Sequence, residues 1–460
     1  MDAERELVEE IRQLEHARAC LAAMKSSTER IADLGVDALA SEGLGRLRAQ
    51  RLKSLAAEPE APPFFGRTDR DDTSSPTGEI LHIGRRHLRD EALNPVVIDW
   101  RAPIARAFYR ATPADRMGVT LRRRFGFGRS GTLTSFEDEH LDRGERLGLE
   151  SAILRDEIER PRVGPMRDIV ATIQPDQDDL VRADLDTSLC IQGAPGTGKT
   201  AVGLHRAAYL LYTYPDRLRR TGVLVVGPNS AFLHYIAQVL PALGEGGIAQ
   251  ATVDQLVASA PVRGQDSVPT AVLKGDARLA RALQRAVLEH VVKPAEDVVA
   301  VMGTRRHRVG AHHLRRYVDD SRRAFLAGQL RWNPARERLL LQVGEDVRRQ
   351  REAVGGAPSD AETRRVARSP AVRAAVDAVW PPLSAPELLA RLYTDPRLLA
   401  RCAPDLDDGE RALLAWTTHP RTVGQAPWTA ADLVLIDELR GLLDGCESYV
   451  HVVVDEAQDL

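Results

Sequence analysis

One short segment has the residue types and spacing of a phosphate-binding loop, G-x-x-x-x-G-K-[ST]. Glycines let backbone amides turn inward around phosphate oxygens, and a following helix points its partly positive N-terminus at the same anion. The lysine supplies a cation for the β- and γ-phosphates, and the threonine hydroxyl can ligate Mg²⁺. The residues are Gly193, Ala194, Pro195, Gly196, Thr197, Gly198, Lys199 and Thr200. The segment therefore predicts binding of ATP with Mg²⁺.

Two apolar runs end in Asp-Glu and could supply the carboxylate that holds Mg²⁺ through water. The first, Asp437-Glu438, follows a capping-box sequence and continues at helical spacing, so we expect Asp437 in the middle of a helix, without a role at the phosphates. The second, Asp455-Glu456, follows the β-branched run 449–454, which predicts a buried strand. Ligands bind at the carboxyl ends of strands in open parallel sheets. We therefore predict that Asp455 positions Mg²⁺ and that Glu456 orients and deprotonates the attacking water.

The elements needed to position these residues alternate in type from residue 188 onward. Residues 188–192 and 223–226 are expected strands, and residues 201–212 and 231–243 are expected helices. Such alternation is typical of an α/β fold with a parallel sheet. The chain between Lys199 and Asp455 is far longer than a few strand–helix units require. We therefore expect a large, mostly helical insertion in this P-loop lobe.

The N-terminal region has different patterns. Apolar residues at helical spacing over residues 2–34, and more weakly to about residue 57, predict a helical hairpin that either packs on its own protein or projects towards a partner. Residues 58–78, rich in Pro, Asp and Ser, predict a linker. Apolar and polar residues alternate from Val119 to Phe127, which favours a strand in a small antiparallel β module.

Two stretches are rich in arginine. Eight arginines and one acid, Asp115, lie between Arg101 and Arg129, which indicates either a solvated face or a contact surface for nucleic acid or an acidic protein. The second stretch lies in the expected insertion and contains Arg305-Arg306-His307-Arg308 and His312-His313-Leu314-Arg315-Arg316. No carboxylate or thiol completes a metal-binding spacing with these histidines, so a basic contact surface is the favoured interpretation.

The composition sets the class of protein. The chain has 460 residues, 43% hydrophobic and 28% charged, which predicts a soluble protein of several domains. It has neither a run of ~18 apolar residues nor a secretory signal, so we expect a cytoplasmic protein without a membrane partner. Four separated cysteines favour neither disulfides nor a zinc cage. The net charge of −3 means that an anionic partner must meet local basic patches.

Two motifs resemble those of superfamily 1 helicases of the UvrD/Rep type. Asp455-Glu456-Ala457-Gln458-Asp459 is similar to the family's D-E-x-Q-D motif, and Ile173-Gln174-Pro175-Asp176-Gln177 is similar to its adenine-sensing segment. The resemblance implies a RecA-like lobe in which Gln177 hydrogen-bonds the adenine edge and Gln458 couples the γ-phosphate to lobe movement. Val226-Gly227-Pro228-Asn229-Ser230 replaces the Thr-Phe-Thr-Asn type that grips single-stranded DNA, which argues against DNA tracking.

Longer segments resemble HelD-type RNA polymerase recycling motors, including their rifamycin-resistance relatives. They are Asp99-Trp100-Arg101-Ala102-Pro103, Phe108-Tyr109-Arg110-Ala111-Thr112, Met166-Arg167-Asp168-Ile169-Val170-Ala171-Thr172-Ile173 and Thr200-Ala201-Val202-Gly203-Leu204-His205-Arg206-Ala207-Ala208-Tyr209-Leu210-Leu211. The resemblance covers the whole chain and is specific around residues 79–245. It implies that ATP drives release of stalled or inhibited RNA polymerase from nucleic acid. Residues 2–57 would enter the polymerase's secondary channel, and the insertion would reach its primary channel.

The expected organisation follows from these patterns and resemblances. The parts are a helical hairpin arm (1–57), a linker (58–78), a small β module (79–141), the P-loop part of the first RecA-like lobe (142–254), a mostly helical insertion (255–430) and the return to that lobe (431–460).

The sequence ends at Leu460, directly after the second motif. We therefore expect a fragment or truncated product without the second lobe, whose arginines are worth ~10³–10⁵ in rate, and hence weak ATP binding and poor hydrolysis. Two alternatives stay open. One is a superfamily 1 DNA helicase, and the other is a non-enzymatic RNA polymerase binder that uses the arm and the β module.

Overall fold

The computed structural model describes residues 2–30, 45, 52, 55, 61–71, 79–128, 131–147, 151–159, 169–237, 248–417, 420–446 and 448–459. The chain divides into two compact units. The first unit comprises Met1–Val253 and Ser448–Leu460, and the second comprises Asp254–Glu447. None of the helices in the described ranges is both long enough and apolar enough to span a membrane.

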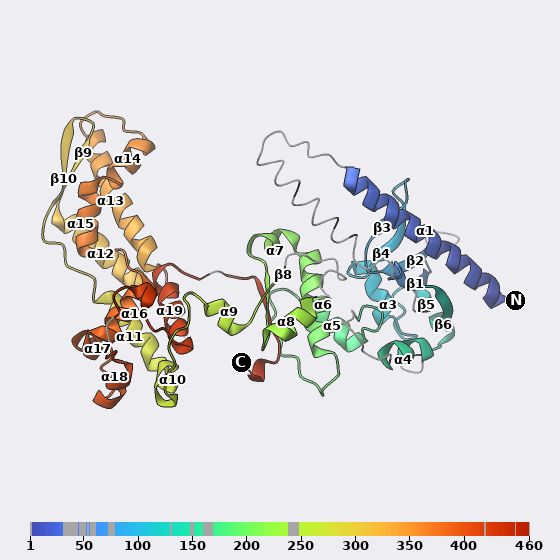
Figure 1. Cartoon of the computed structure of the whole chain (residues 1–460). Helices are drawn as coiled ribbons and strands as arrows, with labels where there is room; N and C mark the ends of the chain where they lie inside the picture. The colour runs from blue at the N-terminus through green and yellow to red at the C-terminus, as the bar shows by residue number, and fades with distance from the viewer. Residues whose placement is uncertain are drawn as a thin grey trace. The chain divides into compact units, whose positions relative to one another are not determined.

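A six-stranded sheet forms the N-terminal part of the first unit, with strand order β3-β4-β2-β1-β5-β6 (Figure 1). Its strands are β1 (Phe64–Arg70), β2 (Glu79–Gly84), β3 (Leu88–Arg89), β4 (Pro95–Asp99), β5 (Val119–Phe127) and β6 (Leu133–His140). All neighbouring pairs are antiparallel except β2 and β4, which are parallel. The predicted β module is thus confirmed as an antiparallel-rich sheet.

Strand β1 shows that the linker prediction for residues 58–78 was wrong in its central part. β1 is a central strand, paired with β2 on one side and β5 on the other. Phe64 and Phe65 are both buried in its first two positions. The Pro-, Asp- and Ser-rich residues around this strand gave the whole segment a loop-like composition, although the strand itself has apolar and β-branched residues to bury.

Helix α1 (Asp2–Arg30) lies along this sheet and contacts β3, β4 and β6 (Figure 1). Leu14 and Ala17 of the helix are buried in one core with Phe64, Val97 and Phe125. The first helix of the predicted hairpin therefore packs on its own protein. The second expected helix, up to residue 57, lies almost wholly outside the described residues.

A three-stranded parallel sheet with strand order β11-β7-β8 forms the other part of the first unit. Its strands are β7 (Val223–Val226), β8 (Ile248–Ala251) and β11 (His451–Val454). Helices α5 (Pro175–Arg182), α6 (Lys199–Thr213), α7 (Pro215–Thr221) and α8 (Ser230–Ala237) and the 3₁₀ turn η5 (Ala457–Asp459) belong to this part. Helices α3 (Arg106–Arg110) and α4 (Ala152–Glu159) and the 3₁₀ turns η1 (Pro103–Ala105) and η2 (Leu141–Arg143) lie with the six-stranded sheet. The strand expected at 223–226 and the helix expected at 201–212 are confirmed.

The strand expected at residues 188–192 was wrong. This segment has no regular secondary structure, and residues 186–190 are exposed. An extended segment becomes a strand only where a neighbouring strand shares its backbone hydrogen bonds, and no strand of the described sheet pairs with residues 188–192. The described parallel sheet therefore has three strands, and the RecA-like architecture around the P-loop stays a prediction.

One hydrophobic core joins the two sheets of the first unit. Phe65 and Phe108 from the N-terminal part share it with Val202, Leu204 and Val225 from α6 and β7. Each of these five side chains is at least 96% buried. The N-terminal sheet and the helix that follows the P-loop therefore belong to one packed body.

The second unit is mostly helical, with one β hairpin (Figure 1). Its elements are α9 (Val253–Val257), α10 (Val268–Lys274), α11 (Ala277–Leu288), β9 (Val298–Met302), β10 (Arg305–Val309), α12 (Ala311–Leu326), α13 (Trp332–Glu352), α14 (Asp360–Ala367), α15 (Pro370–Val379), α16 (Ala385–Thr394), α17 (Pro396–Cys402), α18 (Asp408–Leu414), η4 (Val423–Gln425) and α19 (Ala430–Leu443). Trp332 and Trp380 stack at 4.1 Å between ring centroids in its core.

Helix α19 begins with the expected capping box, formed by Thr429 and Asp432. Asp437 lies in the middle of this helix, as predicted. Leu433 and Ile436 are buried in the core of the second unit. The chain therefore returns to the first unit at Ser448 and not at the predicted residue 431.

Candidate nucleotide-binding site

The P-loop leads directly into the N-terminus of α6. Gly198 is the N-cap of this helix, and both Gly196 and Gly198 have a φ of +82°. Side chains other than glycine rarely adopt this left-handed conformation. A Cβ atom on Gly196 would meet nothing within 4 Å, so the requirement for glycine there is conformational and not steric. The loop thus has the backbone shape that turns amides towards a bound anion.

The Lys199 side chain lies back over the loop. Its Nζ atom donates to the carbonyl oxygens of Gly193 at 3.0 Å and Ala194 at 3.2 Å. The hydroxyl of Thr197 donates to the same Ala194 oxygen at 2.9 Å. Residues 193–197 are exposed. An ammonium group is therefore held beside a solvent-facing loop at the positive end of a helix dipole.

Gln177 connects the expected adenine-sensing segment to this loop. Its Oε1 atom accepts a hydrogen bond from the backbone N–H of Gln174 at 3.0 Å, which caps α5. Its Nε2 atom donates to the Thr197 carbonyl oxygen at 3.2 Å. Both ends of the amide are therefore engaged within the protein. The predicted contact of Gln177 with adenine stays a prediction.

Helix α6 and strand β7 run in opposite directions. Val202, near the start of α6, packs in the same core as Val225. Leu210, near the end of the helix, packs in the same core as Val223. The N-terminus of α6 therefore lies at the carboxyl edge of the parallel sheet, where β11 ends immediately before Asp455. The fold thus brings the P-loop and Asp455 to one edge of the sheet.

Asp455 has a carboxylate oxygen that the described chain leaves unused. Its backbone N–H donates to the Val226 carbonyl at 2.9 Å, and its Oδ1 accepts from the Glu456 N–H at 3.1 Å. Its Oδ2 is buried and has no hydrogen-bond partner among the described residues. Buried polar atoms are costly without a partner, so this oxygen fits a role towards a metal-bound water.

The other predicted residues of this edge are more exposed. Glu456 is exposed and has a φ of +50°, and Gln458 donates to the Glu456 carboxylate at 2.5 Å. Thr200 is half-buried in the first turn of α6. The described residues contain no group of three or more His, Cys, Asp or Glu that could hold a metal ion. A Mg²⁺ ion here would therefore need phosphate oxygens and water as further ligands.

Strand β11 differs from its prediction as a buried strand. Val452 and Val454 are 45% and 49% exposed, because β11 pairs only with β7 within the described chain. His451 at the start of the strand is half-buried. Burial lowers the pKa of His451 to about 4, and the nearby Arg206 charge adds to this effect. His451 is therefore neutral at neutral pH.

Comparison with known families concerns the N-terminal part of the chain. Residues 1–152 match the family model described as DNA helicase IV HelD, N-terminal domain. The chain therefore carries a HelD-type N-terminal domain. No curated protein matches the chain. The resemblance to HelD that the sequence indicated is thus confirmed over residues 1–152, which include α1 and the six-stranded sheet.

The HelD-type N-terminal domain is tied to both helices of the candidate site. Arg182, in the last turn of α5, donates to the carbonyl oxygens of Trp100 at 2.7 Å and Arg101 at 3.2 Å. Trp100 is fully buried, and its ring lies 5.6 Å from that of His205 on α6. The sequence reasoning gave no role to Arg182. The only feature of the sequence that pointed to this contact was the resemblance of the segment around Trp100 to HelD proteins.

Several of the arginines between residues 101 and 129 form ion pairs within this domain. Arg122 pairs with Glu139, and Arg101 pairs with Asp99. Arg123, which is 2% exposed, pairs with Asp138 and with carboxylates of α1. For these arginines, both predicted interpretations, a solvated face and a contact surface, were wrong. Their acidic partners lie outside the stretch, where a local count of charges does not find them.

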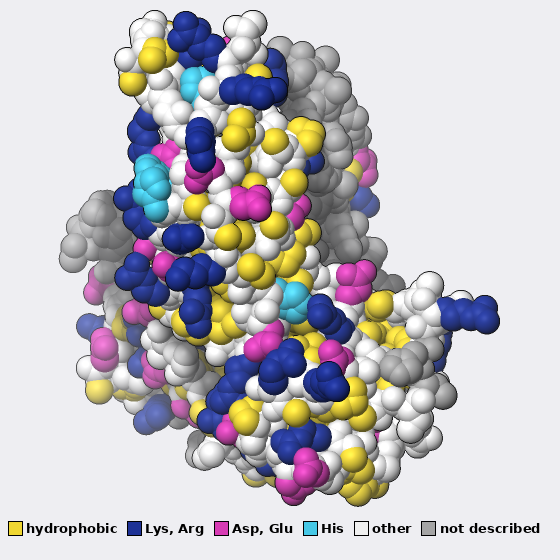
Figure 2. All heavy atoms as spheres, turned by 90° about the vertical axis from the view of Figure 1, so that its left-hand side faces the viewer, with side chains coloured by type: hydrophobic (Ala, Val, Ile, Leu, Met, Phe, Trp, Pro, Cys, Tyr) yellow, Lys and Arg dark blue, Asp and Glu magenta, His cyan; other side chains and the backbone are white. Residues whose placement is uncertain are grey.

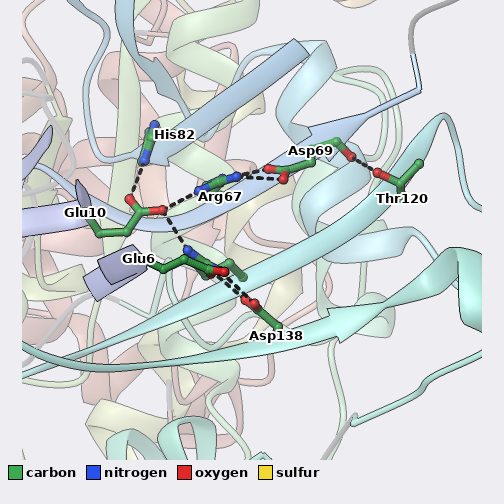
Figure 3. Close-up of polar contacts among 8 residues, drawn as sticks. Glu6, Glu10, Arg67, Asp69, His82, Thr120 and Asp138 are labelled. Atoms are coloured by element: carbon green, nitrogen blue, oxygen red, sulfur yellow. Dashed lines mark hydrogen bonds and ion pairs between the residues drawn. The ribbon is translucent and has the colours of Figure 1, made fainter. Parts of the chain in front are cut away.

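A buried ionic cluster fixes α1 to the sheet (Figure 3). Glu10 of α1 is 2% exposed and accepts from Arg67 at 2.6 Å, Arg123 at 3.1 Å and His82 at 2.8 Å. Burial raises the pKa of Glu10, but the hydrogen bonds and charges of His82 and Arg67 outweigh burial and hold it at about 2. Arg67 also binds Asp69. The carboxylate therefore stays ionised while its three partners surround it.

Proposed function

We propose that the chain is a HelD-type ATP-binding protein that remodels RNA polymerase and helps to release stalled or drug-inhibited polymerase from nucleic acid. One observation carries the proposal. The HelD-type N-terminal domain shares a core with α6, and α6 begins at a P-loop with two left-handed glycines. A polymerase-directed domain and a nucleotide site on one packed body provide a direct mechanical link between ATP binding and the polymerase.

Each residue has a distinct part in this proposal. Lys199 and the loop amides bind the phosphates, while Thr200 and Asp455 hold Mg²⁺, which neutralises phosphate charge when it is bound. Glu456 orients and deprotonates the attacking water. Gln458, which is hydrogen-bonded to Glu456, couples the γ-phosphate to lobe movement. Gln177 positions Thr197 of the loop and reads the adenine edge. The buried free oxygen of Asp455 supports this assignment of the metal side.

Helix α5 connects the P-loop to the N-terminal domain through hydrogen bonds. Gln177 sits at the loop end of α5, and Arg182 sits at the other end on the Trp100 and Arg101 carbonyls. Arg206 of α6 donates to the carbonyls of Leu180 and Ala183, at 3.1 and 2.5 Å. A displacement of the loop is therefore transmitted to the N-terminal domain through hydrogen bonds at both ends of one short helix.

Co-purification with RNA polymerase tests the proposal. We expect the immobilised chain to retain RNA polymerase, and we expect Mg–ATP to change the retained fraction. The Lys199→Ala variant should retain polymerase without this response to ATP. No retention of polymerase, with or without ATP, would contradict the proposal. Retention that ignores ATP in both proteins would support the non-enzymatic binder instead.

A second candidate function is a DNA helicase, which the wording of the matched family model favours. Strong stimulation of ATP hydrolysis by single-stranded DNA, without any effect of RNA polymerase, would support it over polymerase remodelling.

A further inference from the structure

Residues 298–373 of the second unit concentrate positive charge. They include 17 arginines and eight acidic residues, whereas the whole chain has a net charge of −3. The stretch runs from hairpin β9–β10 through α12, α13 and α14 into α15. An excess of arginines creates a positive surface only if these side chains have no acidic partners within the fold. The arginines of the first basic stretch, between residues 101 and 129, largely do have such partners.

Most acidic residues of this stretch form ion pairs with four of its arginines or cap a helix. Arg323 pairs with Asp320, Arg336 with Glu337, Arg349 with Asp346, and Arg348 with Glu345, Glu352 and Asp360. Glu362 closes the capping box of α14. Ten exposed arginines form no ion pair with a described acid: Arg305, Arg306, Arg315, Arg316, Arg322, Arg338, Arg364, Arg365, Arg368 and Arg373. Their charge therefore faces solvent.

Hairpin β9–β10 presents one face of this surface. Val298, Ala300 and Val309 point into the core, with at most 3% exposed. On the opposite face, Val299 and Val301 are 47% and 54% exposed and lie directly opposite arginines of β10 in the strand register. The outer face of the hairpin thus carries Val299, Val301, Arg306 and Arg308, and Arg308 pairs with Asp297. Arg305 lies opposite Met302 at the turn end of the hairpin, where its side chain is exposed.

Helices α14 and α15 pack against β9 and carry further exposed arginines. We call the combined set the arginine face. It consists of Arg305 and Arg306 on β10, Arg364 and Arg365 on α14, Arg368 after it, and Arg373 on α15. Figure 2 looks at the side of the second unit on which Figure 1 draws β10, and Lys and Arg side chains are spread over the height of that face.

We propose that the arginine face binds the phosphate backbone of double-stranded nucleic acid, with hairpin β9–β10 against the duplex. A duplex carries one negative charge per ~1.7 Å of its axis, which matches guanidinium groups spread over a hairpin and two helices. The guanidinium fork is complementary to phosphate oxygens. A two-stranded ribbon also has the dimensions of the major groove. An acidic protein would need a separate carboxylate opposite each of these arginines.

The test measures binding of a labelled 24-base-pair duplex of mixed sequence to the full chain by fluorescence anisotropy at several salt concentrations. We expect Arg305→Ser/Arg306→Ser to weaken binding and to reduce the slope of log affinity against log salt by about 2, one for each lost phosphate contact. Arg305→Lys/Arg306→Lys should restore most of the slope, because the charge is kept.

The matched control is Arg106→Ser/Arg116→Ser. These two exposed arginines of the first unit form no ion pair with a described acid, so the control removes the same charge from a different surface. Equal effects of the two double variants, or no binding of duplex at low salt, would overturn the proposal. An unlabelled poly-glutamate peptide that displaces the duplex at equal charge concentration would assign the face to an acidic protein instead.

The inference does not depend on the proposed ATP site. Lys199→Ala should bind the duplex like the unmodified chain, so loss of the nucleotide site and loss of the arginine face have different signatures.

Discussion

Replacing Lys199 with alanine is expected to lower the affinity of the chain for Mg–ATP by about 100-fold, or about 3 kcal/mol. The ammonium group lies over the P-loop, within 3.2 Å of two loop carbonyl oxygens, at the N-terminus of α6. Charge-assisted hydrogen bonds to phosphate are among the stronger polar interactions in proteins. Isothermal titration calorimetry with ATP and Mg²⁺ measures the change directly.

Lys293→Ala is the matched control, because it removes the same charge from an exposed lysine of the second unit. We expect the affinity of this variant to equal that of the unmodified chain. If Lys199→Ala and Lys293→Ala bind ATP equally well, the assignment of the P-loop lysine is wrong.

The second large effect concerns Glu10. Glu10→Ala should lower the free energy of unfolding of the first unit by about 3 kcal/mol, since removal of one partner leaves buried charges without compensation. Arg67, Arg123 and His82 all converge on this one carboxylate. Unfolding in urea can be followed by ¹⁹F NMR of fluorotryptophan at Trp100, because the other four tryptophans lie in residues 254–447.

The stabilisation by Glu10 has a defined dependence on pH. The pKa of Glu10 is about 2 in the folded chain and 4.5 when unperturbed, so the unfolded state binds more protons between these values. The stabilisation is therefore complete above about pH 4.5 and is lost as the pH falls towards 2. Glu9→Ala, at an exposed neighbouring position, should change neither the stability nor its pH dependence. A Glu10→Ala variant as stable as Glu9→Ala would show that the cluster does not hold α1.

Local patterns in the sequence were enough for several elements of the site. The P-loop spacing located the start of α6, and the apolar run 223–226 matched β7 residue for residue. The capping box before Asp437 placed this residue correctly within a helix. Each of these signals lies within about ten residues, where hydrogen-bonding and packing preferences act directly on the chain.

Other features depended on partners far away in the sequence. Arg123 is neutralised by Glu10, 113 positions earlier, so its apparent basic patch is an internal ion pair. The segment 188–192 has strand-like residues but no strand beside it. Val452 looked like a core residue, yet it is 45% exposed on a strand with one partner. Pairing and burial are properties of the assembled fold, and periodicity alone does not specify them.

We propose that ATP and Mg²⁺ are held between the P-loop and Asp455. Calorimetry with ATP, in Mg²⁺ and in EDTA, on the unmodified chain and on Asp455→Asn tests it most directly. We expect Mg²⁺ to strengthen ATP binding to the unmodified chain by about tenfold, or about 1.4 kcal/mol, and we expect Asp455→Asn to lose this gain. An equal gain from Mg²⁺ in both proteins, or no heat of binding in either, would contradict it.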